Sequence, residues 1–299
     1  MIGTAFRRGG LKKIGRAGFW DAAKPSVLAA NGVTDHSITW SDGFVEDVRR
    51  TIEACQIFLF FPIYVINDGG IGTIQTSQGS SMTTNGAPND LLNNFNPLTI
   101  IVAIPIISYG LYPLLRKYKI NFGPIKRITF GFILAALSSV AGAVTQYYIY
   151  QTSPCGYYAT DCTVGTGVSP ISIWVQIPQY VLGALSECFA NVTVLELAYA
   201  RAPRDMKGLV MSMYLFSNAL SAAIGEACTP SLNDPNLIWP WAVPAILGFL
   251  LAIWFYYLYR DLDNEEYIRE GVAEENDTAN LARSVSQGGS GEEVHDEKV

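Results

Sequence analysis

Six long apolar segments alternate with short polar stretches and dominate the pattern of the chain. They cover residues 50–78, 97–115, 128–150, 171–199, 208–228 and 238–259. Each is long enough to cross a hydrocarbon layer of about 30 Å as a helix that rises about 1.5 Å per residue. The pattern therefore predicts an all-α membrane protein, a bundle of six transmembrane helices.

The two ends of the chain differ from this apolar middle. Residues 1–48 contain no long apolar run, and residues 261–299 are rich in acids and end in SQGGSGEEVHDEKV. We expect an N-terminal segment at 1–48, a six-helix bundle at 49–260 and a disordered acidic tail at 261–299. Within the first segment, 19–31 predicts a small docked or amphipathic element, and Asp42 is the expected N-cap of the first helix.

Composition supports a membrane protein and excludes several other classes. Only 15% of the residues are charged, whereas about a quarter are charged in an average soluble domain. The basic residues form no patch interleaved with aromatics, which argues against a nucleic-acid partner. The sequence shows no set of nucleophile, base and orienting residue and no cysteine or histidine spacing typical of a metal site, so we expect neither an enzyme nor a metalloprotein.

Lysine and arginine are distributed unevenly among the loops. The loops at 116–127 and 201–207 carry basic residues, whereas those at 79–96, 151–170 and 229–237 carry none. The positive-inside rule then predicts that both termini lie in the cytosol. Cys155 and Cys162 share an outer loop, and the pattern leaves open whether they form a disulfide there.

The strongest candidate for function is Glu187, which lies in the middle of the fourth segment. An acidic residue at the centre of a membrane helix costs at least about 2.5–3.5 kcal/mol. We favour a carboxylate that faces a cavity and holds a ligand ammonium or a proton; the alternative is a protonated acid bonded to a neighbouring helix. Asn191 lies one turn further on the same face, and Pro178 is expected to kink the helix.

Other polar residues of the apolar segments have two interpretations. Each either lines a cavity or forms hydrogen bonds between helices. Asp68 has a further alternative, a solvated acid at the rim of the bundle. The candidates are Tyr64, Asn67, Asp68, Gln78, Asn96, Tyr214, Ser217 and Asn218.

Several stretches together resemble a known family. They are FWDAAKPS, FLFFPIY followed by SQGSSM, NPLTIIVAIPIISYGLYPLL, and the run S-E-x-F-A-x-x-T-x-L-E-x-A-Y-x-x-A-P that begins at Ser186. They resemble the fungal proton-coupled oligopeptide transporters, the POT/PTR family of the major facilitator superfamily. The likeness runs from about Phe19 to Asp263 and covers the second half of such a transporter, its helices seven to twelve.

The resemblance implies a six-helix bundle equivalent to the C-terminal half of a facilitator fold. In the family, the residue that matches Glu187 binds the N-terminal ammonium of a di- or tripeptide and the one that matches Asn96 assists it. Tyr64, Tyr214 and Asn218 would line side-chain pockets. The implied activity is symport of small peptides with protons, driven by the proton gradient without a bound cofactor. We expect the plasma membrane as its location, and the sequence leaves the vacuolar membrane and a substrate such as nitrate open.

Two departures from the family pattern change this expectation. Val65, Asp68, Gly69 and Gly70 stand where many fungal relatives have a tryptophan and then Y-N-Q, and the E-x-x-E-R motif of the first half is absent from the sequence. Because such transporters rock two halves about a central site, we expect this half to be inactive alone and to lack an N-terminal six-helix half. The alternative is a non-transporting receptor, or a subunit that assembles with a separate N-terminal half.

Overall fold

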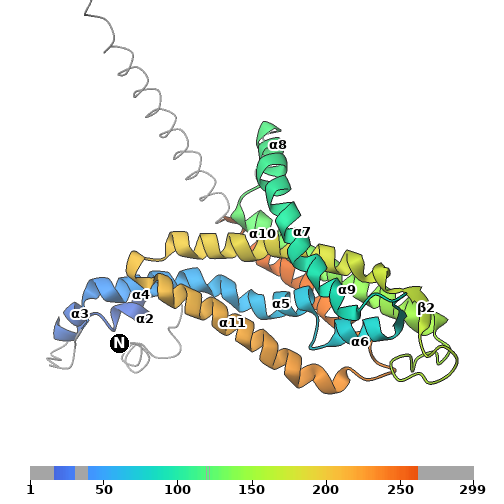
Figure 1. Ribbon diagram of the computed structural model, residues 1–299. Coiled ribbons are helices and arrows are strands. Elements are labelled where there is room, and N and C mark those ends of the chain that lie inside the picture. The colour runs from blue at the N-terminus through green and yellow to red at the C-terminus, as the bar shows by residue number, and fades with distance from the viewer. Residues whose placement is uncertain (1–16, 31–39, 119, 121, 262–299) are drawn as a thin grey trace, which may run out of the picture.

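The protein is a bundle of long helices that run side by side (Figure 1). The computed structural model describes residues 17–30, 40–118, 120 and 122–261, so the predicted tail, beyond its first residue, and residues 1–16 lie outside the described part. Six helical stretches are long and apolar enough to cross a membrane, which confirms the predicted six-helix fold. They are Asp42–Ser80, Leu91–Lys117, Pro124–Thr152, Ile173–Arg201, Lys207–Ser231 and Trp239–Asp261.

The first of these stretches is broken into four pieces. Helix α4 (Asp42–Cys55) continues through the 3-10 turn η2 (Gln56–Phe60) into α5 (Phe61–Gly69), and α6 (Ile74–Ser80) follows after a short break. At the break Gly70 has a φ of +74°, a left-handed conformation that glycine adopts without a steric penalty. The span therefore begins at Asp42 rather than at residue 50, and the predicted boundary at 48/49 falls inside α4.

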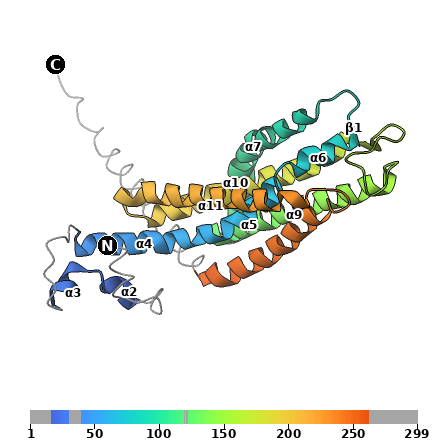
Figure 2. The ribbon, with the colours of Figure 1, turned by 90° about the horizontal axis from the view of Figure 1, so that it is seen from below.

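The second stretch leaves the bundle at a steep angle, and its end projects away from the other helices (Figures 1 and 2). It consists of the 3-10 turn η3 (Asn89–Asn94), α7 (Phe95–Pro105), the π-helical turn η4 (Ile106–Leu111) and α8 (Tyr112–Lys117). The π-turn begins directly after Pro105, whose ring removes a backbone donor and disturbs the helical hydrogen-bond pattern.

The centre of the bundle is the contact between α9 (Pro124–Thr152) and α10 (Ile177–Arg201). Ser138 of α9 donates a hydrogen bond to the backbone oxygen of Gln179 of α10 at 2.7 Å. The predicted kink at Pro178 is wrong: this proline lies in the first turn of α10, after the 3-10 turn η5 (Ile173–Gln176). A proline is tolerated there because the first N–H groups of a helix have no partner within it.

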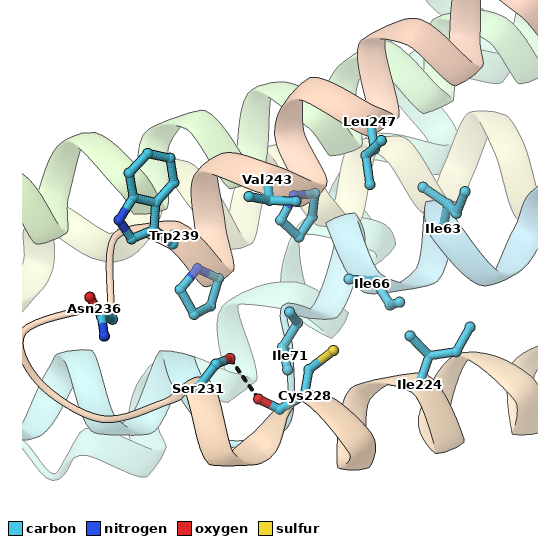
Figure 3. Close-up of a pocket in the computed structure, with 12 residues that line it drawn as sticks. Ile63, Ile66, Ile71, Ile224, Cys228, Ser231, Asn236, Trp239, Val243 and Leu247 are labelled. Atoms are coloured by element: carbon cyan, nitrogen blue, oxygen red, sulfur yellow. Dashed lines mark hydrogen bonds between the residues drawn. The ribbon is translucent and has the colours of Figure 1, made fainter.

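The last two helices pack against α5, and the final helix also contacts α9. They are α11 (Lys207–Cys228), preceded by η6 (Arg204–Met206) and followed by η7 (Thr229–Ser231), and the final helix Trp239–Asp261. Phe61 of α5, Phe132 of α9 and Phe255 of the final helix are almost fully buried in one aromatic core. Towards the loops, the final helix, α5 and α11 surround an apolar cavity (Figure 3).

The loops at one end of the bundle are tied together, and we call this end the disulfide end. Cys155 and Cys162 form a disulfide in the loop after α9. A short parallel sheet joins β1 (Met82–Thr83) to β2 (Ser169–Ser172), which the helical pattern of the sequence does not predict. Asp234 accepts hydrogen bonds from the Tyr150 hydroxyl at 2.5 Å and from the Thr160 backbone N–H at 2.7 Å.

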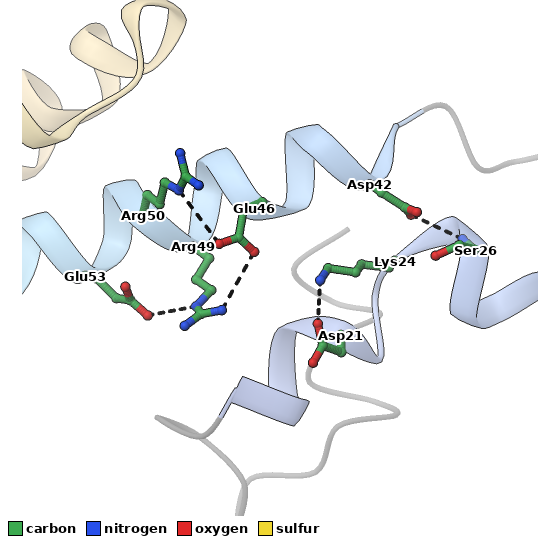
Figure 4. A network of polar contacts seen from close by, with 8 residues as sticks. All are labelled: Asp21, Lys24, Ser26, Asp42, Glu46, Arg49, Arg50 and Glu53. Carbon is green, nitrogen blue, oxygen red and sulfur yellow. Dashed lines mark hydrogen bonds and ion pairs between the residues drawn. The ribbon is translucent and has the colours of Figure 1, made fainter.

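The opposite end carries two short helices that pack against α4 (Figure 4). These are α2 (Ala17–Asp21) and α3 (Pro25–Ala30), and they agree with the predicted docked element. Phe19, Ala23 and Val45 form a small buried cluster there. The N-cap of α4 is Ser41, which accepts from the Phe44 N–H at 3.2 Å; the expectation that Asp42 caps this helix is wrong.

Charged groups reinforce this junction. Asp42 accepts from the backbone N–H of Ser26 at 3.2 Å, and Lys24 pairs with Asp21 at 2.6 Å. The hydrogen bond that Lys24 donates to the Asp21 carboxylate raises the pKa of Lys24. Along α4, Arg49 pairs with both Glu46 and Glu53, and Arg50 pairs with Glu46.

Candidate functional site

A small polar cavity lies between α5, α6, α10 and the start of the second span. Its volume is about 150 Å³. Two carboxyl groups, two asparagine amides, a glutamine and a tyrosine contribute to its wall. The lining residues are Asp68, Gly69, Gln75, Asn93, Asn96, Tyr180, Gly183 and Glu187.

Glu187 points into this cavity from the middle of α10. The Asn96 side-chain amide of α7 donates a hydrogen bond to Glu187 Oε1 at 2.7 Å. A hydrogen bond to a carboxylate is stronger than one between neutral groups, so the amide holds this oxygen in a defined position. The pair joins two helices whose residues are 91 positions apart in the sequence.

Asp68 reaches the same cavity from the last turn of α5. Its Oδ1 accepts a hydrogen bond from the Ser186 hydroxyl at 2.6 Å, and its carboxyl group is within hydrogen-bonding reach of Glu187. A Cβ on Gly183 would lie 3.2 Å from Asp68 Oδ1, so the close approach of α5 and α10 depends on the small residue there. Asp68 is therefore a partly buried residue of the cavity wall.

The wall of the cavity that holds the two carboxyl groups contains no lysine or arginine. Two carboxylates in contact repel each other unless a proton or a cation lies between them. The arrangement can therefore bind a positively charged group.

Three residues predicted to line a pocket do not line this cavity. Tyr64 is only 1% exposed in the aromatic core, and its hydroxyl reaches the site indirectly, 3.3 Å from the Ser186 hydroxyl. Tyr214 packs against the rings of Phe58 and Phe61 from α11, and Asn218 lies one turn further on the same helix. All three lie outside the wall of this cavity, and their role in a side-chain pocket stays a prediction.

The remaining polar candidates, other than Asp68, also lie outside the cavity. Asn67 donates to the backbone oxygen of Ile63 at 3.0 Å, and Ser217 donates to that of Tyr214 at 2.8 Å. Gln78 is buried and donates to the Gly142 backbone oxygen and to the Gln146 side chain. The Asn191 side-chain oxygen is buried and has no hydrogen-bond partner within the described residues. Hydrogen bonding inside or between helices accounts for Asn67, Ser217 and Gln78.

Tyr180, Gly183, Ser186 and Asn93 were not singled out by the sequence analysis. Tyr180 and Gly183 precede Glu187 by seven and four positions, and this helical spacing places all three on one face of α10. Ser186 and Asn93 carry no such signal. The role of Ser186 depends on its contact with Asp68, and that of Asn93 on where the first turn of the second span lies.

A larger cavity of about 310 Å³ lies nearer the disulfide end (Figure 3). Its wall is mainly Ile63 and Ile66 of α5, Ile224 of α11, and Val243 and Leu247 of the final helix. None of the side chains that line it is charged, and its Ser231 hydroxyl is bonded to the backbone oxygen of Cys228. The polar cavity at Glu187 is therefore the candidate site for an ionic ligand.

Known proteins similar to this chain are transporters. The MFS-type transporter ucsM of an Acremonium species is 50% identical over 256 residues, which are 86% of this chain and 42% of that protein. The peptide transporter PTR2 of Candida albicans is 43% identical over 94% of this chain and 46% of its own length. The probable peptide transporter ptr2 of Schizosaccharomyces pombe is 36% identical over 92% of this chain and 43% of its own length. The chain thus spans less than half the length of these relatives.

Solved structures show the same fold. An auto-inhibited POT family peptide transporter superposes with a TM-score of 0.61 at 22% identity, covering 81% of this chain and 45% of that one. The POT family transporter PepTSo superposes with a TM-score of 0.59 at 21% identity, and the match covers 90% of this chain and 53% of that one. The sequence profile described as the POT family matches residues 20–243, well over half of the chain. These matches confirm the resemblance: the chain belongs to the POT family.

Proposed function

We propose that this chain forms one half of a proton-coupled peptide transporter and that Glu187 binds the N-terminal ammonium of the peptide. The observation that carries the proposal is the Glu187 carboxylate, held by Asn96 in a polar cavity within a membrane bundle. The names of the relatives support the substrate class, since several are called peptide transporters.

The chemistry of binding is an ion pair without covalent steps. Asn96 occupies Glu187 Oε1 and thereby fixes the plane of the carboxylate, so that its other oxygen is presented to the ligand. Partial burial lowers the local dielectric constant and strengthens the attraction between a carboxylate and an ammonium. No bound cofactor is required, because the proton gradient supplies the driving force.

Transport requires a second wall for the site. Facilitator transporters bind their substrate between two six-helix halves and expose it alternately to the two sides. In our proposal a second six-helix unit provides the opposite wall. The protein lies in the plasma membrane with both termini in the cytosol, as the basic residues of the loops at 116–127 and 201–207 favour.

The test is the binding of dialanine to the chain reconstituted in lipid nanodiscs, measured by calorimetry. We expect Glu187→Gln to weaken binding at least about tenfold, because it removes the charge that pairs with the ammonium. The matched control is Glu226→Gln, which removes the same charge from an exposed position at the disulfide end of α11. Equal affinities of wild type and Glu187→Gln, or no binding by the wild type, would contradict the proposal.

A further inference from the structure

We propose that Asp68 is a second ammonium ligand, so that the site binds a primary ammonium between two carboxylates rather than on Glu187 alone. This inference rests on the proposed function. It adds a residue that determines specificity, since a ligand held in this way needs several N–H donors as well as a positive charge.

The two carboxyl groups are each held from behind and lie close to each other. Asn96 donates to Glu187 Oε1 at 2.7 Å, and Ser186 donates to Asp68 Oδ1 at 2.6 Å. The Asp68 carboxyl group is within hydrogen-bonding reach of Glu187 in the same cavity. Two carboxyl groups so close need a proton or a cation between them, and a ligand ammonium can take that place.

The supports behind Asp68 orient it toward this position. The Tyr64 hydroxyl lies 3.3 Å from the Ser186 hydroxyl, which in turn lies 2.6 Å from Asp68 Oδ1. Tyr64 is held by ring contacts with Phe61 and Phe132 in the aromatic core. This chain of contacts connects the rigid core to one oxygen of Asp68, so the carboxyl group is positioned by the fold.

The chemistry of the cavity matches a primary ammonium. An –NH₃⁺ group has three donors, and placed between the two carboxylates it can donate one hydrogen bond to each. A third acceptor is available in the wall, the Asn93 side-chain oxygen, which is 3.5 Å from the Tyr180 hydroxyl. A cation between the carboxylates also removes their mutual repulsion, so each carboxylate contributes to binding beyond its own hydrogen bond.

The experiment compares dialanine with N-acetyl-dialanine, which lacks the ammonium, on the full 299-residue chain in nanodiscs. For each variant the readout is the ratio of the two affinities, which does not depend on the fraction of folded protein. We expect Asp68→Asn to lower this ratio about tenfold, since its isosteric amide keeps the shape and loses the charge. The control Glu226→Gln should leave the ratio unchanged.

The outcomes separate this inference from the proposed function. A lower ratio in Glu187→Gln but not in Asp68→Asn would overturn the second ligand and leave the proposed function intact. An unchanged ratio in both variants would overturn both proposals. A lower ratio only in Asp68→Asn would support Asp68 as the ligand and overturn the role of Glu187.

A second variant keeps the test decisive if Asp68→Asn does not fold. Ser186→Ala retains the Asp68 charge and removes the hydroxyl that positions it. We expect the ratio to fall about threefold, because Asp68 keeps its charge but loses the hydrogen bond that orients it. An unchanged ratio in Ser186→Ala would then overturn the proposal.

Discussion

Glycine at position 131 determines how closely α9 and α10 approach each other behind the site. A Cβ there would lie 2.7 Å from the Ala190 side chain, 2.9 Å from the Ala190 backbone nitrogen and 3.0 Å from the Ser186 backbone oxygen. Two of these atoms belong to the backbone of α10, which cannot rotate away as a side chain can. The residue thus supports the position of Ser186, and through it that of Asp68.

We therefore expect Gly131→Ala to destabilise the bundle. Overpacking of a tight helix contact costs about 1–3 kcal/mol, which should lower the temperature of thermal unfolding in detergent. Gly208→Ala is the matched control, because no atom lies within 4 Å of the added methyl group and alanine favours helix over glycine. Equal unfolding temperatures for Gly131→Ala and wild type would show that α9 and α10 can separate without cost.

Among the elements, the loops of the disulfide end depend on one acid that joins three segments. Asp234, between α11 and the final helix, binds the end of α9 through Tyr150 and the disulfide loop through Thr160. Hydrogen bonds to a charged group contribute about 1.5–3 kcal/mol each when the groups are not fully solvated. The loop after α9 is thereby fastened at a point other than the disulfide.

Replacement of this acid should loosen the loop without unfolding the bundle. In Asp234→Ala we expect faster amide hydrogen exchange across 153–168, because the Thr160 N–H loses its acceptor. Asp161→Ala provides the control, since Asp161 is an exposed acid of the same loop. Exchange rates that match the wild type in both variants would mean that the disulfide and the β1–β2 pairing hold the loop by themselves.

At the scale of the whole molecule, the distribution of charge predicts the orientation in the membrane. The loops at 79–96, 151–170 and 229–237 contain no lysine or arginine, and the first two of them carry the paired strands and the disulfide. Basic residues gather in the loops at the other end of the helices. The positive-inside rule and the disulfide both favour an extracytosolic position for the disulfide end.

Glycosylation mapping tests this orientation in a eukaryotic host. An N-x-T acceptor inserted in the loop at 79–96 should be glycosylated, whereas one inserted at 116–127 should not be, because only the first reaches the lumen of the secretory pathway. The readout is the change in gel mobility that endoglycosidase treatment removes. The native acceptor at Asn276 is expected to remain unmodified. Modification at 116–127 would reverse the proposed topology.

The sequence predicts individual residues of the site but not which of them lie together. Glu187 stands out because a carboxylate inside a long apolar run is costly wherever its neighbours lie. Its partners carry no comparable signal: Asn96 is 91 positions away, and Asp68 is 118 positions from its donor Ser186. For Tyr64 and Gln78 the sequence leaves two interpretations, because whether a polar side chain lines a cavity or lies in the core depends on which helix packs against it.

The sequence by itself determined the number of spans, the family and the position of the buried acid, because hydrophobicity over some twenty residues and local motifs depend on neighbours along the chain. The tertiary structure alone decided which polar residues meet, where the helices break and that Asp68 joins Glu187 in one cavity. These features depend on contacts between helices that are distant in sequence. Their geometry follows from packing, in which a single glycine such as Gly183 sets how closely two helices approach.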